Sequence, residues 1–455
     1  MNVEFFEQIS QKKNDIIKML TEWVAIPSVS NQKAADGTPF GKACHDMFEK
    51  AIESANELGL TLCKNYDDNV LTVDLCEGKP AFGIICHLDV VDADGQNWTN
   101  SPWKATVIDD KIYGRGVSDN KGPGVAALFA LAFLKEHGLT NKNIRLYLGT
   151  SEETGSPDVL YYQAHYEKKE DMPPVVVPDA GNNITYGEWG VQRMALSAKI
   201  CPMSQVEILN IHSGESFNTI PGSAVAEVKG IALDEAKALI KEDEKISLSE
   251  GKNGNLVISV TGKSCHSAAP QNGINSAMIL LEALLALPLD EETQKVFFDI
   301  YNLYANKPIA ILSPSETREL TFSLTGLFLS DNSLSTWHDT RYDYNITSEE
   351  LQEQVNEYFK NSSVKASFEM AKPPHLVDKD HPFVNKLAQI YEEHEGVKPW
   401  IREIKAATYS SQTDIGVGYG QFPGANAHGV DENIKIDDIL KTAKLLAYTA
   451  YKFQQ

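Results

Sequence analysis

Several segments of the chain place a histidine or an acid directly after an apolar run or in a polar loop. The most informative one is residues 81–89, where the apolar run ends at His87 and Asp89 follows two positions later. A neutral imidazole can bind a metal ion, and a nearby carboxylate can hold its tautomer. The other candidates are Asp119, Glu152, Glu153, Asp179 and His428. Two imidazoles with several carboxylates form a donor set that suits a pair of borderline divalent cations.

Glu152 and Glu153 are adjacent acids that follow the apolar segment 143–150. Neighbouring side chains on an extended segment point in opposite directions. We therefore expect one of them to bind metal while the other faces the substrate as a base. Ordinary structural roles are the alternative for every candidate: Asp119 could cap a helix, the two glutamates could form a solvated turn, and the others could be loop residues. Their coincidence at strand ends favours the metal site.

The elements that must position these residues alternate between strand and helix in the first part of the chain. The segments that read as strands there are 69–76, 81–86, 143–150 and 174–177, and we expect the first two to be neighbours across a turn. Residues 122–138 form a strong helix pattern that stops at Gly138. This alternation predicts an α/β domain with a mixed sheet flanked by helices.

A change of pattern near residue 187 predicts an inserted α+β unit. Strand-like segments there are 191–200, 256–262, 319–328 and 337–344, and helical ones are 232–243, 273–287 and 348–360. From His381 the alternation of helix and strand returns, and a helix over 436–453 closes the chain.

Composition excludes several classes of partner. With 63 acidic and 41 basic residues, the net charge of −22 argues against nucleic acid and anionic membranes. No stretch approaches the roughly 20 apolar residues of a membrane span. The first 30 residues lack the basic start and apolar run of a signal peptide, and the six cysteines show no paired spacing. We expect a cytoplasmic protein with reduced thiols.

Four motifs occur in a fixed order, namely HLDVV at 87–91, YGRGVSDNKGP at 113–123, GTSEETGS at 149–156 and VPDAG at 177–181. With these motifs the chain resembles the M20 metallopeptidase family, and more narrowly its bacterial Xaa-His dipeptidases of the carnosinase type. The resemblance extends from residues 20–30 to residues 427–432. It implies a zinc-peptidase-like catalytic domain at 1–187 plus 375–455, interrupted by a large α+β lid domain at 188–374.

The resemblance also implies a role for each candidate. The implied metal ligands form two pairs around a shared carboxylate: His87 with Asp179, Glu153 with His428, and Asp119 between them. Two divalent cations would be bound, with Zn²⁺ expected and Mn²⁺ or Co²⁺ as alternatives. Glu152 would be the general acid/base for a metal-bridging water, and Asp89 would support His87.

Three residues of the implied lid domain resemble substrate contacts. His266 matches a lid histidine that donates a hydrogen bond to the oxyanion, Arg341 matches a clamp for the substrate carboxylate, and Asn218 matches a second carboxylate contact. The structural alternatives are a core histidine, a strand-surface salt bridge and a turn asparagine. The chain departs from the family at residues 406–411, where AATYSS replaces a Gly-Gly-Thr-type turn and an arginine. This departure concerns specificity, because the metal ligands are complete.

The function that follows is a metal-dependent dipeptidase acting on short unblocked peptides. The alternatives are an M20-type amidohydrolase that removes the acyl group of N-acyl amino acids or succinyl-diaminopimelate, and a binding protein without activity. Glu152 beside a complete ligand set favours an enzyme. The long lid implies a monomer in which lid closure gates the reaction.

Overall fold

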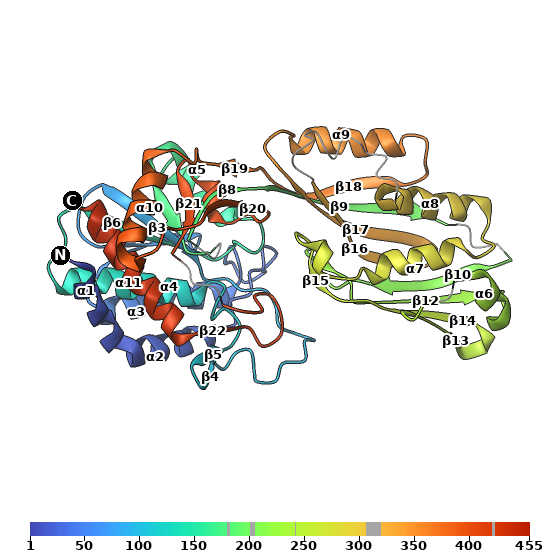
Figure 1. Ribbon diagram of the computed structural model, residues 1–455, viewed down its shortest axis with the longest axis horizontal. Coiled ribbons are helices and arrows are strands. Elements are labelled where there is room, and N and C mark those ends of the chain that lie inside the picture. The colour runs from blue at the N-terminus through green and yellow to red at the C-terminus, as the bar shows by residue number, and fades with distance from the viewer. Residues whose placement is uncertain (180–182, 201–204, 242, 306–319, 421–423) are drawn as a thin grey trace. The chain divides into compact units, whose positions relative to one another are not determined.

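Two large sheets, each in its own part of the chain, organise the fold (Figure 1). The computed structural model describes residues 1–179, 183–200, 205–241, 243–305, 320–420 and 424–455. The chain divides into a first unit, Met1–Glu188 with His375–Gln455, and a second unit, Trp189–Pro374. The expected fold class is confirmed: helices flank a mixed sheet in the first unit, and an α+β unit interrupts it.

The sheet of the first unit has the strand order β1-β2-β6-β3-β7-β21-β8-β19, and β20 also pairs with β8. Its strands are β1 (Leu62–Tyr66), β2 (Val70–Asp74), β3 (Pro80–His87), β6 (Asn143–Gly149), β7 (Val175–Val177), β8 (Ile184–Glu188), β19 (His375–Leu376), β20 (Ile401–Ile404) and β21 (Gly416–Tyr419). Strand β3 runs parallel to β6 and β7, and β21 runs parallel to β7. The carboxyl ends of these four strands therefore lie along one edge of the sheet.

The expectation that β2 and β3 are neighbours is wrong, because β6 lies between them. The physical reason is that β3 is apolar from Phe82 to Cys86 and is buried on both faces there, which favours a central position. Ile84 and Cys86 enter the core that contains the residues of α4, whereas Ile85 packs with Val159 and Tyr162 of α5 on the other face.

Helices cover both faces of this sheet. The helical segments of the first unit are α1 (Val3–Phe6), η1 (Glu7–Lys12), α2 (Lys13–Val24), α3 (Lys42–Glu57), α4 (Lys121–Glu136), α5 (Pro157–His165), η2 (Lys169–Asp171), α10 (Pro382–Glu395), η6 (Tyr409–Gln412) and α11 (Ile436–Phe453). A small sheet is formed by β4 (Thr106–Ile108), β5 (Lys111–Tyr113) and β22 (Asn433–Lys435). At the first turn of α4 the ammonium group of Lys121 is buried and donates to the carbonyls of Trp23 and Ile26, at 2.9 and 2.6 Å. This contact ties the start of α4 to the end of α2.

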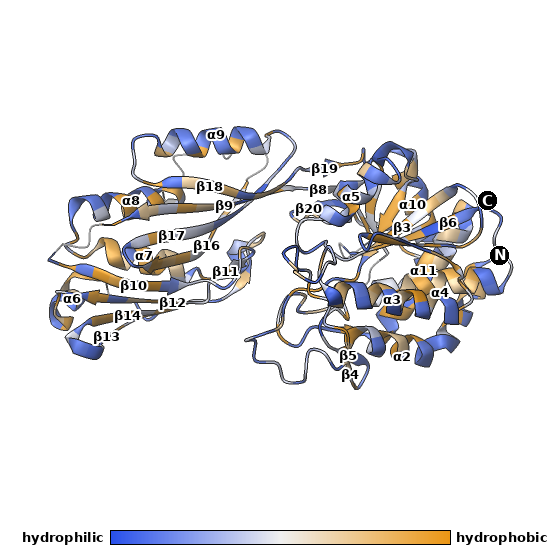
Figure 2. Ribbon diagram, turned by 180° about the vertical axis from the view of Figure 1, so that it is seen from behind, coloured by the Kyte–Doolittle hydropathy of each residue, from blue (hydrophilic) through white to orange (hydrophobic). Residues whose placement is uncertain are grey.

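The second unit is built on an antiparallel sheet with the order β13-β14-β12-β10-β16-β17-β9-β18. Its strands are β9 (Gly190–Lys199), β10 (Glu207–Ser213), β12 (Ser223–Lys229), β13 (Ile246–Glu250), β14 (Leu256–Thr261), β16 (Thr321–Ser330), β17 (Ser333–Tyr342) and β18 (Lys365–Lys372), and β11 (Thr219–Ile220) pairs separately with β15 (Cys265–His266). Its helical segments are α6 (Leu233–Leu239), η3 (Lys252–Gly254), η4 (Pro270–Asn272), α7 (Ser276–Leu285), α8 (Glu291–Ala305) and α9 (Ser348–Phe359). Helix α9 is mostly hydrophilic, whereas the strands carry many apolar residues (Figure 2).

Two further observations bear on the sequence expectations. No helix in the described part of the chain is long and apolar enough to cross a membrane. The five cysteines in the described residues are free thiols, and the sixth, Cys201, lies outside the described residues.

Gly149, the last residue of β6, leads directly into the segment that carries Glu152. An added Cβ would collide with the hydroxyl of Tyr409 and the carboxylate of Asp158. We expect Gly149→Ala to lower the free energy of unfolding by about 1–3 kcal/mol, the usual cost of overpacking. Urea denaturation of the variant and the wild-type protein measures this difference. Equal unfolding midpoints would contradict the tight packing inferred at this strand end.

Candidate active site

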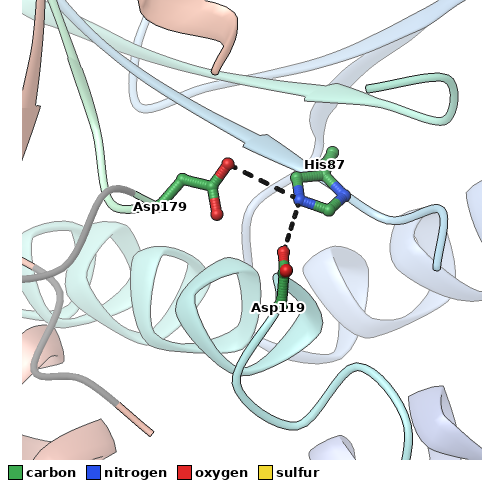
Figure 3. Close-up of side chains that lie close together, drawn as sticks. All are labelled: His87, Asp119 and Asp179. Atoms are coloured by element: carbon green, nitrogen blue, oxygen red, sulfur yellow. Dashed lines mark hydrogen bonds and ion pairs between the residues drawn. The ribbon is translucent and has the colours of Figure 1, made fainter. Parts of the chain in front are cut away.

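Polar residues that follow the parallel strands of the first unit gather at one edge of its sheet. His87 ends β3, Glu153 follows β6, and Asp179 follows β7. His428 comes from the segment between β21 and β22, and Asp119 lies two positions before the first residue of α4. Figure 3 shows the side chains of Asp119 and Asp179 turned toward the His87 ring. Parallel strand order thus brings distant parts of the sequence into one cluster.

The carboxylate of Asp119 lies between two imidazoles. Its Oδ1 is 2.9 Å from Nε2 of His87, and its Oδ2 is 3.0 Å from Nε2 of His428. Nε2 of His87 is also 3.6 Å from Oδ2 of Asp179, and Nε2 of His428 is 2.9 Å from Oε1 of Glu153. Two groups of three ligands result, each with ligand atoms within 4.8 Å of one another, and Asp119 belongs to both. All five ligands expected from the sequence therefore lie together, around one shared carboxylate.

The electrostatics of this cluster fit bound cations. Burial disfavours the charged form of His87, but Asp179 and Asp119 outweigh burial and raise the pKa of His87 well above 6.5. The pKa of His428 is raised in the same way, against burial, by Glu153 and Asp119. Burial raises the pKa of Glu153 to about 7 and that of Asp179 to about 6.

Burial raises the pKa values of Glu153 and Asp179, whereas in the two histidines burial is outweighed by neighbouring carboxylates, which raise the pKa. Buried acids that resist ionisation, next to imidazoles that hold protons, indicate a site with too little positive charge for its carboxylates. Two divalent cations would supply that charge, and imidazole nitrogen and carboxylate oxygen are suitable ligands for Zn²⁺, Mn²⁺ or Co²⁺. The residues present therefore fit a pair of such ions.

Glu152 lies in a turn, so the expectation of an extended segment at residues 152–153 is wrong. The chain reverses here because the amide of Gly155, with φ +104°, donates to the carbonyl of Glu152 at 3.1 Å. The turn is held by Asp89, whose carboxylate accepts hydrogen bonds from the amides of Glu152 and Glu153 at 3.1 and 3.0 Å. Even so, ligand atoms of His87 and of both glutamates lie within 4.8 Å of one another.

Asp89 contacts His87 as well as this turn. Nδ1 of His87 is 2.9 Å from the backbone carbonyl of Asp89 and 3.4 Å from its carboxylate Oδ1. A proton on Nδ1 leaves Nε2, the atom that faces Asp119, as the lone-pair nitrogen for a metal. The fully buried Asp89 therefore orients His87 and the glutamate turn at the same time.

Glu432 and Arg115 also support the cluster, although the sequence analysis did not select either of them. The buried carboxylate of Glu432 accepts hydrogen bonds from the amides of residues 116, 118 and 119 at 2.9–3.1 Å. It also accepts from Nη1 of Arg115 at 2.9 Å, and Nη2 of Arg115 donates to the carbonyl of His428 at 3.3 Å. One ion pair thus holds the backbone at Asp119 and at His428. Arg115 lies in the motif at 113–123, and Glu432 ends the segment 427–432. Their place in these motifs is the sequence signal that could have identified them.

The divergent segment 406–411 is a second support. Thr408 donates through its amide and its hydroxyl to Glu188, at 2.8 and 2.6 Å. Tyr409 donates through its hydroxyl to the buried Asp158, which also accepts from the amides of residues 150 and 151 at 2.8 and 2.9 Å. Burial raises the pKa of Asp158 to about 7. The segment therefore fixes the strand end from which Glu152 projects.

The three residues expected to contact substrate lie together in the second unit. The amide of Ser267 donates to the carbonyl of Asn218 at 2.9 Å, and Ser267 directly follows His266. The hydroxyl of Ser267 donates to Oδ2 of Asp339 at 2.5 Å, and Nε of Arg341 donates to the same oxygen at 2.9 Å. A short hydrogen-bond network through Ser267 and Asp339 therefore connects Asn218 with Arg341, and His266 is the residue next to Ser267. The salt bridge of Arg341 is buried and does not lie on the strand surface.

Comparison with known proteins gives a consistent picture. The profile of Peptidase family M20/M25/M40 matches residues 83–452. The putative dipeptidase YtjP of Bacillus subtilis (strain 168) is 31% identical over 468 aligned residues, which cover 98% of each chain. A putative dipeptidase of Staphylococcus aureus (strain bovine RF122 / ET3-1) is 27% identical over 432 residues, or 91% of each chain.

Two solved structures share the fold. Human carnosine dipeptidase 1 has a TM-score of 0.63 at 18% identity, with 100% of each chain covered. The aminoacylhistidine dipeptidase of Vibrio alginolyticus has a TM-score of 0.54 at 13% identity, with 95% of each chain covered.

We expect Glu432→Gln to weaken the binding of divalent cations, because an amide replaces one of the two oxygens that accept the backbone donors around Asp119. Loss of such an outer support commonly costs 10–100-fold in metal affinity. Competition with a chromophoric chelator measures this affinity. Asp431→Asn is the matched control, because Asp431 lies on the same segment and accepts hydrogen bonds from Thr99 instead. Equal affinities in Glu432→Gln and the wild-type protein would contradict the inferred support.

Proposed function

The chain belongs to Peptidase family M20/M25/M40, and from this premise we propose that it is a dipeptidase that hydrolyses the peptide bond of short unblocked peptides. Membership makes it a metal-dependent peptidase. The observation that carries the proposal is the carboxylate of Asp119 between His87 and His428, with Glu152 beside the same cluster. Relatives described as putative dipeptidases support the substrate class.

Two divalent cations are proposed for the five-residue cluster. One would be held by His87 and Asp179, the other by Glu153 and His428, and both by Asp119. Zn²⁺ is the expected ion, with Mn²⁺ or Co²⁺ as alternatives. When bound, such ions polarise the scissile carbonyl and lower the pKa of a bound water.

Glu152 is the proposed general acid/base. It is 7% exposed, and its carboxylate belongs to the third ligand group, with His87 and Glu153. The hydrogen bonds from its turn to Asp89 fix where that carboxylate can reach. In this position Glu152 takes a proton from the attacking water and returns it to the leaving amine.

Substrate recognition is assigned to the residues of the second unit. Arg341 is proposed to bind the carboxylate of the peptide, Asn218 to make a further contact with it, and His266 to donate a hydrogen bond to the oxyanion. Acids beside the metal cluster would bind the free amino group of the peptide. Recognition of both ends would limit the length of the substrate. We also propose that the enzyme acts as a cytoplasmic monomer.

Substitution Glu152→Gln tests the role of the base. The amide retains the shape of the side chain but cannot accept the proton, so kcat should fall about 10²–10⁴-fold. Metal content, measured by atomic emission after dialysis, should stay the same, because Glu152 is not one of the proposed ligands. Glu170→Gln, at an exposed glutamate of η2, is the control and should leave kcat unchanged. A variant at Glu152 with wild-type kcat would refute the assignment.

A substrate panel tests the length limit and the reaction class. Chelated protein, restored with one metal at a time, should cleave free dipeptides. With N-acetylated dipeptides and with pentapeptides, kcat/KM should be at least tenfold lower, because each loses a charge-assisted contact that is worth roughly a factor of ten or more. If the protein hydrolyses N-acyl amino acids but not dipeptides, the dipeptidase proposal is rejected and the deacylase alternative is favoured.

A further inference from the structure

Strand β17 presents two different faces. His338 points to the helical side, where it contacts the hydroxyl of Tyr304 from α8. Trp337, whose side chain alternates with that of His338, stacks on Phe217 with ring centroids 4.7 Å apart. Asp339 lies on the same side of the strand as Trp337. The segment that carries Phe217 and Asn218 is therefore anchored on the face of β17 that lies away from α8.

Asp339 joins two chain segments on that face. It is 0% exposed, and its Oδ2 accepts from Oγ of Ser267 and from Nε of Arg341. Ser267 is itself fixed at three atoms, since its carbonyl accepts from Oγ of Ser323 at 3.0 Å and its amide donates to Asn218. The position of the Arg341 side chain is thereby tied to the turn that begins at Ser267, directly after His266 at the end of β15.

Among the residues that the structure describes, Asp339 contacts Arg341 through one guanidinium nitrogen, Nε. Binding through Nε holds the plane of the guanidinium group, and within the described part of the chain no hydrogen bond engages the two terminal nitrogens, which can donate to another acceptor. Two parallel N–H donors on a fixed plane match the two oxygens of a carboxylate. A guanidinium group held in this way suits a planar anionic ligand.

Stability alone explains this ion pair poorly. Within the described residues, Oδ1 of Asp339 is buried and has no hydrogen-bond partner. A buried oxygen without a partner is unfavourable, and buried ion pairs as a class contribute little to stability. A role in positioning Arg341 accounts for the buried acid at residue 339.

We propose that Asp339 and Ser267 are positioning residues that set Arg341 for the free C-terminal carboxylate of the peptide, and so determine specificity for unblocked C-termini. The inference rests on the proposed function, in which Arg341 binds that carboxylate. It adds two residues that determine how well the carboxylate is distinguished from an uncharged end.

The test compares one dipeptide with its C-terminal amide. Wild-type enzyme should prefer the free acid, and Asp339→Asn and Ser267→Ala should each raise KM for the acid about tenfold, the usual effect of weakening a charge-assisted hydrogen bond. KM for the amide should change less than twofold, so the preference for the acid falls. Asp343→Asn is the matched control: this acid is 1% exposed, lies just beyond β17 and bonds to Asn345, and its variant should keep the wild-type preference.

The possible results distinguish a failure of the positioning role from a failure of the proposed dipeptidase function. Equal losses on the acid and the amide, in variants with a wild-type circular dichroism spectrum, would overturn the positioning role while dipeptide hydrolysis stands. A wild-type enzyme that cleaves dipeptides without preferring the acid would overturn it together with the role of Arg341. Absence of dipeptide hydrolysis by the metal-loaded wild type would reject the proposed function itself. If Asp339→Asn does not fold, the smaller change Ser267→Ala decides.

Discussion

The structure of the first unit depends on negative charge that is held close together and largely out of water. The carboxylate of Asp119 lies between His87 and His428, with the acids Asp179 and Glu153 next to the same imidazoles. Repulsion among such acids grows as the surroundings become less polar, and it must be offset by positive charge. The raised pKa values of both histidines express this need. The proposed pair of metal ions would satisfy it, provided that the backbone prevents the acids from moving apart.

Buried acids that accept backbone amides provide that rigidity. Asp89 holds the turn of the two glutamates, Glu432 holds the segment before α4, and Asp158 holds the end of β6. Each of these acids is fully buried and binds amide donors that lack partners in regular secondary structure. Asp339 in the second unit acts in a related way, although its donors are the side chains of Ser267 and Arg341. Positioning by buried carboxylates is thus common to both units.

Much of the fold could be predicted from local patterns, and the failures have identifiable causes. Helix α11 agrees with the expected range 436–453, because its apolar spacing is strong. Strand β18 has no counterpart among the expected elements, since its partly exposed side chains give a weak signal. β2 pairs with β6 instead of β3 because the crossover through α4 places β6 between them. This pairing joins segments that are far apart in the sequence. No local pattern contains that information.

The sequence by itself determined the family, the fold class and the residue types available for chemistry, because strand ends and ordered motifs are local properties. Only the tertiary structure decided which atoms meet. It placed the carboxylate of Asp119 at 2.9 and 3.0 Å from the two imidazoles, and it showed that Glu152 lies in a turn and that Asp89 contacts His87 mainly through its carbonyl. It also revealed Glu432 and Asp339, whose partners lie up to 317 and 72 positions away. Such contacts arise from strand order and chain reversal, which bring together atoms whose separation along the sequence carries no record of their proximity.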